Sequence, residues 1–197
     1  MDLRRLKNEV QSLPNLQEQL RQLQLAWVKP LHAKNSPLLA YLDRERQQEL
    51  RKQLSRTNGL FASLREGRLI QEKLQQQARY LLELKLSLLQ GNATRGQQLI
   101  QLLLKDSFLS IKQTIAEVQQ LEQNVSLLAR DYAQINTFLE ERLPLEGTLL
   151  YADLPHRQHL LELQRTAERQ KSVVREIGKE FIMLTRSSKG KMGTRKD

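Results

Sequence analysis

Residues 104–143 read LKDSFLSIKQTIAEVQQLEQNVSLLARDYAQINTFLEERL, and this stretch decides the fold. Steps of four and three residues alternate along it without a slip, which places one row of residues on one side of a helix. This first seam consists of Leu104, Phe108, Ile111, Ile115, Val118, Glu122, Val125, Ala129, Tyr132, Asn136, Leu139 and Leu143. A helix of this length extends about 60 Å, so the spacing predicts an elongated helix that lies alongside other helices.

A second apolar row flanks the first seam at Leu121, Leu128 and Ile135. The resulting face is wider than a two-stranded coiled coil needs, and it favours a bundle. Two polar residues, Glu122 and Asn136, interrupt the seam. Either they fix the register of the helices at a cost in stability, or they lie in a solvated end of the bundle. The pattern leaves both readings open.

The composition is that of an all-α protein. The sequence is rich in residues that lose little side-chain freedom in a helix, and only 5% of the residues are aromatic. Few segments have the β-branched and aromatic enrichment of strands. We therefore expect an elongated antiparallel helical bundle or coiled coil of about five helices. The absence of cysteine excludes disulfides, thiolate zinc sites and cysteine catalysis.

Proline, glycine and asparagine divide the chain into these helices. The expected helices cover about residues 2–29, 37–56, 97–143 and 156–185, and a further helix runs from near residue 60 or residue 67 to residue 90. Pro14 interrupts the first helix, because proline lacks the N–H of the helix ladder. Ser36 and Pro37 predict the start of the second helix, and Thr57-Asn58-Gly59 its end.

The expected helices group into four regions. The turn at residues 91–96 predicts an antiparallel hairpin between the two helices that flank it. The regions are basic N-terminal helices with a proline hinge at 1–60, a long helical hairpin at 61–143, a loop and C-terminal helix at 144–185, and a disordered basic tail at 186–197.

The expected C-terminal helix carries a second regular seam. It is formed by Leu160, Leu163, Ala167, Gln170, Val174, Ile177, Phe181 and Leu184. The apolar residues of both seams are the candidate interface with partner helices. One partner is available within the chain, since the two seams match, and we expect another chain to cover the rest of the first seam. Trp27, the only tryptophan, is expected in the core.

Charge is unevenly distributed along the chain. The net charge is +10, yet residues 97–154 carry eight acidic and four basic side chains. The basic N-terminal half and tail therefore suggest contact with a polyanion, namely nucleic acid, an acidic protein or the microtubule surface. The candidate polyanion-facing residues in the tail are Arg186, Lys189, Lys191, Arg195 and Lys196.

The search for catalytic and metal-binding residues is short. His156 and His159 lie one helical turn apart near Asp153 and Glu162, a spacing that can place metal ligands on one face. Polar residues at a helix start are the commoner explanation, so we expect His156→Ala to be silent. No phosphate-binding glycine loop or nucleophile elbow is present. We therefore expect that the protein is not an enzyme and that it binds no cofactor, no metal ion and no small-molecule substrate.

The expected cellular compartment follows from the absence of a signal peptide and of a membrane-spanning segment. The N-terminal residues lack the apolar run of a signal peptide, and no uncharged stretch is long enough to span a bilayer. We expect a soluble, cytoplasmic protein without membrane insertion.

The organisation of the chain resembles the small augmin (HAUS) subunits, a family of coiled-coil proteins in spindle assemblies. The resemblance lies in a first amphipathic helix that ends in Trp27-Val28-Lys29-Pro30-Leu31, the basic helix at residues 42–54 (LDRERQQELRKQL), and the long Leu/Gln-rich helices that follow. It implies a non-catalytic subunit of a hetero-oligomer that binds microtubules and promotes branched nucleation in the mitotic spindle. It assigns no functional residue.

Three function classes remain. The leading hypothesis is a non-catalytic coiled-coil subunit of a larger hetero-oligomeric, cytoskeletal assembly, with other coiled-coil subunits and microtubules as partners. A basic nucleic-acid or chromatin-associated helical protein in the nucleus is the second, and a helical chaperone or secretion stalk the third. A cooperatively melting monomer would count against the first, and steeply salt-dependent DNA binding would favour the second.

Overall fold

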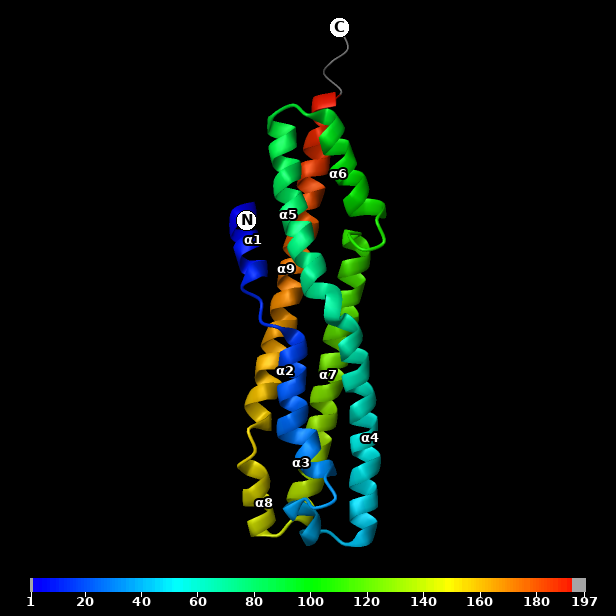
Figure 1. Cartoon of the computed structure of the whole chain (residues 1–197), viewed down its shortest axis with the longest axis vertical. Helices are drawn as coiled ribbons and strands as arrows, with labels where there is room; N and C mark the ends of the chain where they lie inside the picture. The colour runs from blue at the N-terminus through cyan, green and yellow to red at the C-terminus, as the bar shows by residue number, and fades with distance from the viewer. Residues whose placement is uncertain (1, 193–197) are drawn as a thin grey trace. The chain divides into compact units, whose positions relative to one another are not determined.

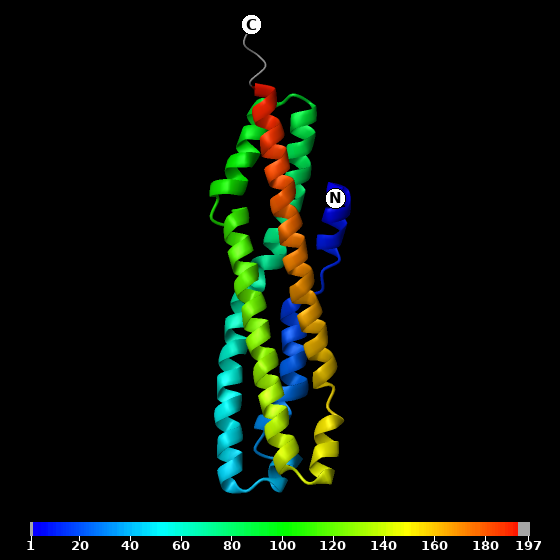
Figure 2. The same cartoon turned by 180° about the vertical axis from the view of Figure 1, so that it is seen from behind.

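The computed structural model describes residues 2–192, with side chains to residue 190, and within this range it contains helices and no strands (Figures 1 and 2). The all-α class is therefore confirmed. The α-helices are α1 (Leu3–Gln11), α2 (Leu16–Leu23), α3 (Lys29–His32), α4 (Arg44–Glu66), α5 (Ile70–Leu89), α6 (Ala93–Lys105), α7 (Ile111–Arg142), α8 (Leu145–Ala152) and α9 (His156–Met192). A π-helical turn at Gln24–Val28 and 3-10 turns at Pro37–Tyr41 and Gly67–Leu69 complete the described elements.

The described chain forms two compact units, each assembled from segments far apart in sequence. Unit 1 combines residues 2–13, 69–120 and 168–192, and unit 2 combines residues 14–68 and 121–167. Since α7 and α9 each contribute residues to both units, the units do not coincide with consecutive regions of the sequence.

Unit 1 is built on α5, which packs against both α1 and α6. Its core combines α1, α5, α6, α7 and α9 through side chains such as Leu6, Leu81, Leu99, Val118 and Ile177, all of which are fully buried. The α5–α6 hairpin is as expected. Gly91 has a φ of 72°, which suits glycine, and the Asn92 side chain accepts a hydrogen bond from the Arg95 N–H at 3.1 Å.

Polar groups join α5 to the segment that precedes and starts α7. Lys73 is 7% exposed, and its Nζ lies 2.7 Å from Glu117 Oε1. Gln77 is fully buried and donates to the Leu109 carbonyl at 3.1 Å and to Thr114 Oγ1 at 2.8 Å. Since buried polar groups are costly without partners, these bonds select one register between α5 and α7.

Unit 2 has the largest aromatic group of the protein in its core. Trp27 is fully buried, which confirms the prediction, and its ring lies 6.5 Å from that of Phe61 and 5.1 Å from that of Tyr132. Pro14 separates α1 from α2 as expected, with the Asn15 side chain capping α2.

The single helix expected over residues 97–143 is wrong, because it breaks between α6 and α7. Asp106 Oδ1 accepts hydrogen bonds from the N–H groups of Phe108 and Leu109, at 2.8 Å and 2.9 Å. The carboxylate thus offers these backbone groups an alternative to the helix ladder, and the chain turns before α7 begins at Ile111.

The expected second helix is wrong at both ends. Pro37 starts only a 3-10 turn, and α4 begins at Arg44 with Asp43 as its N-cap. Thr57-Asn58-Gly59 does not end α4, which continues to Glu66. The Thr57 hydroxyl donates to the Gln53 carbonyl at 3.1 Å within the helix, and the burial of later α4 residues outweighs the cost of one glycine.

The C-terminal predictions also need correction. The expected loop at residues 144–155 contains α8, and α9 continues past Thr185 to Met192. Residues 186–192 of the expected disordered tail are therefore helical. Arg186 and Lys189 are exposed there, while Arg195, Lys196 and the side chain of Lys191 lie outside the described residues.

Both predicted seams are buried for most of their length by the chain itself. Ile111, Val118, Val125, Tyr132, Leu139, Leu160, Leu163, Val174, Ile177 and Phe181 are all less than 9% exposed. Phe108, Ile115 and Leu184 are half-buried, and Leu104 is 51% exposed. The exposed part of the predicted interface is therefore limited to Leu104 and to parts of Phe108, Ile115 and Leu184.

None of the helices described is both long enough and apolar enough to cross a membrane.

Candidate partner-binding surfaces

Helix α1 covers only part of α5 in unit 1. Gln71, near the start of α5, donates to the carbonyl of Leu13, just after the end of α1, at 2.9 Å. The N-terminus of α1 extends from there along α5 (Figure 1). Nine residues of helix span about 14 Å and the twenty of α5 about 30 Å, so α1 ends roughly halfway along α5.

Exposure along α5 changes where α1 ends. Ala78, which lies two turns after Gln71 on the same face of α5, is 1% exposed. Leu82 is half-buried, Leu86 is 49% exposed, and Leu89 is 69% exposed. The face of α5 beside α1 is therefore buried over the first half of the helix, and its leucines are exposed to solvent over the second half.

Helix α9 shows the same change. Arg169 donates to Ser12 Oγ at 3.0 Å, which marks the α9 face beside α1. Glu180, further along this face, is 7% exposed, and Met183 one turn later is 52% exposed. We call these three residues, Leu86 and Leu89 of α5 and Met183 of α9, the exposed apolar set.

Basic residues lie close in sequence to the exposed apolar set. Lys85 and Arg186 are exposed next to its apolar residues, and Lys189 follows one turn later. Arg4 and Arg5 are exposed in the first turn of α1, where the helix dipole already places positive charge. An acidic occupant would relieve this repulsion.

A second apolar surface lies on α8 of unit 2. Leu145 is 72% exposed, Leu149 is 57% exposed and Leu150 is 42% exposed, and we call these three residues the α8 ridge. Glu146 and Asp153 are exposed beside it.

The opposite face of α8 is held firmly in unit 2. Tyr151 is buried, and a Cβ added to Gly147 would lie 3.1 Å from the Tyr41 ring and 3.2 Å from a Leu143 methyl group. Because Gly147 permits this close approach, α8 presents its leucines from a fixed position.

Unit 2 also contains a continuous network of buried polar groups. Trp27 Nε1 donates to the hydroxyl of Tyr151 at 3.1 Å, and that hydroxyl donates to the side-chain carbonyl of Asn136. The hydroxyl of Tyr132 lies 2.6 Å from His156 Nδ1, and His156 Nε2 lies 3.0 Å from the Tyr151 carbonyl. Asn136 therefore binds a side chain from another helix, which favours register over the solvated-end reading of this seam position.

The network determines the protonation of its members. Only a protonated Nε2 can donate to the Tyr151 carbonyl, so the neutral His156 ring accepts from Tyr132 at Nδ1. Burial lowers the pKa of His156, and burial raises the pKa of Tyr132 and of Tyr151. Both nitrogens of His156 are occupied by hydrogen bonds, so the ring acts as a structural element of the core.

This placement makes stability pH-dependent. The lowered pKa of His156 means that the unfolded chain binds a proton more readily than the folded chain below about pH 6.5. The stabilising contribution is therefore present above that pH and is lost as the pH falls towards the folded-state pKa. We expect thermal melts from pH 8 to pH 5 to show a falling melting temperature that is less steep in His156→Ala.

His159→Ala is the matched control for that measurement, since His159 is half-buried and lies one turn further along α9. At pH 8 it should melt close to the wild type. His156→Ala itself should be less stable at pH 8 by about 1–3 kcal/mol, because Tyr132 and the Tyr151 carbonyl lose a partner. A melting temperature equal to wild type would contradict the role of the network and restore the expectation of a silent substitution.

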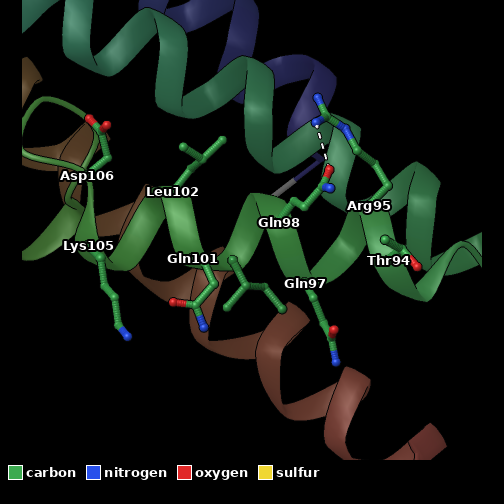
Figure 3. A pocket seen from close by; sticks show the side chains of 9 residues that line it. Thr94, Arg95, Gln97, Gln98, Gln101, Leu102, Lys105 and Asp106 are labelled. Carbon is green, nitrogen blue, oxygen red and sulfur yellow. Dashed lines mark hydrogen bonds between the residues drawn. The ribbon is translucent and has the colours of Figure 1, made fainter.

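The side chains that line the pocket along α6 do not point towards a common site. Thr94, Arg95, Gln97, Gln98 and Gln101 lie along a single helix and their side chains point in different directions (Figure 3). A hydrogen bond of 3.4 Å joins Arg95 to Gln98. These side chains surround no common point at which a substrate atom could be held.

Comparison with known proteins found no protein-family model, no curated protein and no solved structure that matches this chain.

Proposed function

We propose that this chain is a non-catalytic subunit of a larger hetero-oligomeric assembly of helical proteins. The observation that carries the proposal is the exposed apolar set. Its residues lie on faces of α5 and α9 that are buried beside α1 and exposed further along each helix. Exposed apolar side chains of amphipathic helices are typical of surfaces that bind helices of neighbouring proteins.

We assign the assembly to the cytoskeleton, at the mitotic spindle. The resemblance in organisation to augmin subunits supports this assignment, as does the net charge of +10, which suits the acidic surface of microtubules. The exposed basic residues Lys85, Arg186 and Lys189 near the exposed apolar set support it further.

Introducing negative charge into the exposed apolar set is expected to abolish binding of the protein partners. We expect the double variant Leu86→Asp/Leu89→Asp to lose the chains that co-purify with the wild type from native cells. Its melting temperature should stay the same, since both residues are exposed and surface substitutions change stability by about 0.5 kcal/mol or less. Affinity purification with mass spectrometry, alongside a thermal melt, measures both effects.

Leu127→Asp provides the control, because Leu127 is 39% exposed on α7 of unit 2 and does not belong to the exposed apolar set. It should retain every partner. Tubulin among the retained chains at low salt would support the cytoskeletal assignment. Recovery of the same partners with the double variant would overturn the proposal, and loss of the wild-type partners after nuclease treatment would favour the nucleic-acid hypothesis instead.

A further inference from the structure

A pocket of about 380 Å³ lies at the start of α9, within unit 2. Its apolar lining includes Leu161, which is 44% exposed. The residues around it combine apolar and charged side chains, and they are Leu154, Pro155, Arg157, Gln158, Leu161, Glu162 and Arg165. The exposed apolar set belongs to unit 1, so this pocket is a separate surface and what it binds does not depend on the proposed function.

The two arginines of the pocket have no carboxylate partner among the described residues. The one carboxylate in the lining, Glu162, faces its own helix. Gln158 donates to Glu162 Oε1 at 3.4 Å, and His159 Nδ1 lies 3.8 Å from Glu162 Oε2. Arg157 and Arg165 are exposed, and the first turn of α9 contains no acidic residue. Both guanidinium groups are therefore available to an anionic ligand.

The spacing of these residues indicates the shape of that ligand. Arg157, Leu161 and Arg165 are four residues apart, so they lie along one face of α9 at steps of about 6 Å. In an extended chain, every second residue lies on the same side, at steps of about 6–7 Å. A segment of the form acid–x–apolar–x–acid presents its three side chains at a matching interval.

We infer that the pocket binds such a segment of an acidic partner protein in extended conformation. The apolar side chain of the segment enters between Leu154, Pro155 and Leu161, and its two carboxylates accept hydrogen bonds from the guanidinium groups on either side. A helical ligand would need nine residues to place the same three side chains, and the pocket exposes only one leucine of α9 to cover them. A short extended segment is the better match.

The core of unit 2 fixes the pocket in place. His156, beside the pocket, is 4% exposed and forms hydrogen bonds with Tyr132 and with the Tyr151 carbonyl. Leu160 and Leu163 are buried on the other side of the same turns of α9. Because these contacts hold the start of α9 in one position, binding requires little ordering of the protein.

The lining favours carboxylates of a protein over phosphates of a nucleic acid. The apolar centre of the pocket gains free energy only from a ligand that carries an apolar side chain between its charges. The lining contains no aromatic side chain on which a base could stack.

Fluorescence polarisation of a labelled peptide, Ser-Glu-Ser-Leu-Ser-Glu-Ser, with the full chain tests the inference. We expect saturable binding in low salt that weakens as salt is added. Replacing the leucine of the peptide by serine should weaken binding by about tenfold or more, because the apolar contact is lost. Leu161→Asp should weaken it to the same extent with an unchanged melting temperature, since Leu161 is partly exposed.

A reversal of charge provides the second arm of the experiment. The double variant Arg157→Glu/Arg165→Glu should lose the acidic peptide and bind Ser-Lys-Ser-Leu-Ser-Lys-Ser, which the wild type should not bind. Arg175→Glu is the matched control, because Arg175 is an exposed arginine of α9 outside the pocket. It should bind the acidic peptide within about twofold of the wild type.

The absence of saturable binding at the highest attainable protein concentration overturns the inference, as does equal binding of the acidic peptide by Leu161→Asp and the wild type. A short DNA duplex that binds the wild type and Leu161→Asp alike, and more tightly than the peptide does, would identify a phosphate-binding surface instead. Leu86→Asp/Leu89→Asp should bind the peptide like the wild type, so failure of the proposed function and failure of this inference are distinguishable.

Discussion

Replacing Val125 with aspartate should destabilise unit 2 by about 4 kcal/mol or more, a large part of the roughly 5–15 kcal/mol that holds a typical domain folded. Val125 is 3% exposed in α7, and the valine contributes to the seam that this unit buries. A carboxylate at this position either stays charged without a partner or takes up a proton, and both outcomes cost free energy. Urea unfolding followed by tryptophan fluorescence measures the loss, since Trp27 is the only tryptophan and lies in unit 2.

Leu127→Asp is again the matched control. It introduces the same charge two residues away on the same helix, at a side chain that is 39% exposed. Its unfolding midpoint should lie close to that of the wild type. If both variants unfold at the wild-type urea concentration, Val125 is not in a packed core and the burial of the first seam is wrong.

Replacing Trp27 with alanine should cost unit 2 about 3–5 kcal/mol. The ring is fully buried between Phe61 and Tyr132, so its removal leaves a cavity that the surrounding helices cannot fill completely. The same change removes the N–H that binds the Tyr151 hydroxyl. Urea unfolding followed by circular dichroism measures the effect, since the variant lacks the fluorescent residue.

Trp27→Phe separates packing from hydrogen bonding. Phenylalanine keeps most of the aromatic surface but has no donor for Tyr151, so we expect a smaller loss of about 1–3 kcal/mol. A cost for Trp27→Phe equal to that of Trp27→Ala would assign the whole effect to the hydrogen bond. A cost near zero for Trp27→Ala would contradict the packing of this core.

Local chemistry could be predicted from the sequence wherever nearby residues decide the outcome. The helical class follows from composition and spacing, the α5–α6 hairpin from Gly91 and Asn92, and the restart before α2 from Pro14. In each case the physical cause lies within a few residues of the feature, namely a missing N–H, a capping side chain or a backbone that needs glycine.

The failures share a different cause. Thr57-Asn58-Gly59 has the residues of a helix end, yet α4 passes through it because its later residues are buried in unit 2. The expected loop at 144–155 contains α8, which is stabilised by Gly147 against Tyr41 and by buried Tyr151, contacts that no local pattern encodes. His156 reads as a polar residue of a helix start, while its partners, Tyr132 and Tyr151, come from elsewhere in the unit.

What the sequence determined by itself is that this chain is helical and that two of its helices carry regular apolar seams. The spacing of apolar residues along an amphipathic helix predicts which face is buried, and this prediction needs no knowledge of the neighbouring helices. Only the tertiary structure decided what covers each face, because that depends on where other helices end. The chain itself buries most of both seams, and exposed apolar side chains lie on α8 and on the parts of α5 and α9 beyond α1.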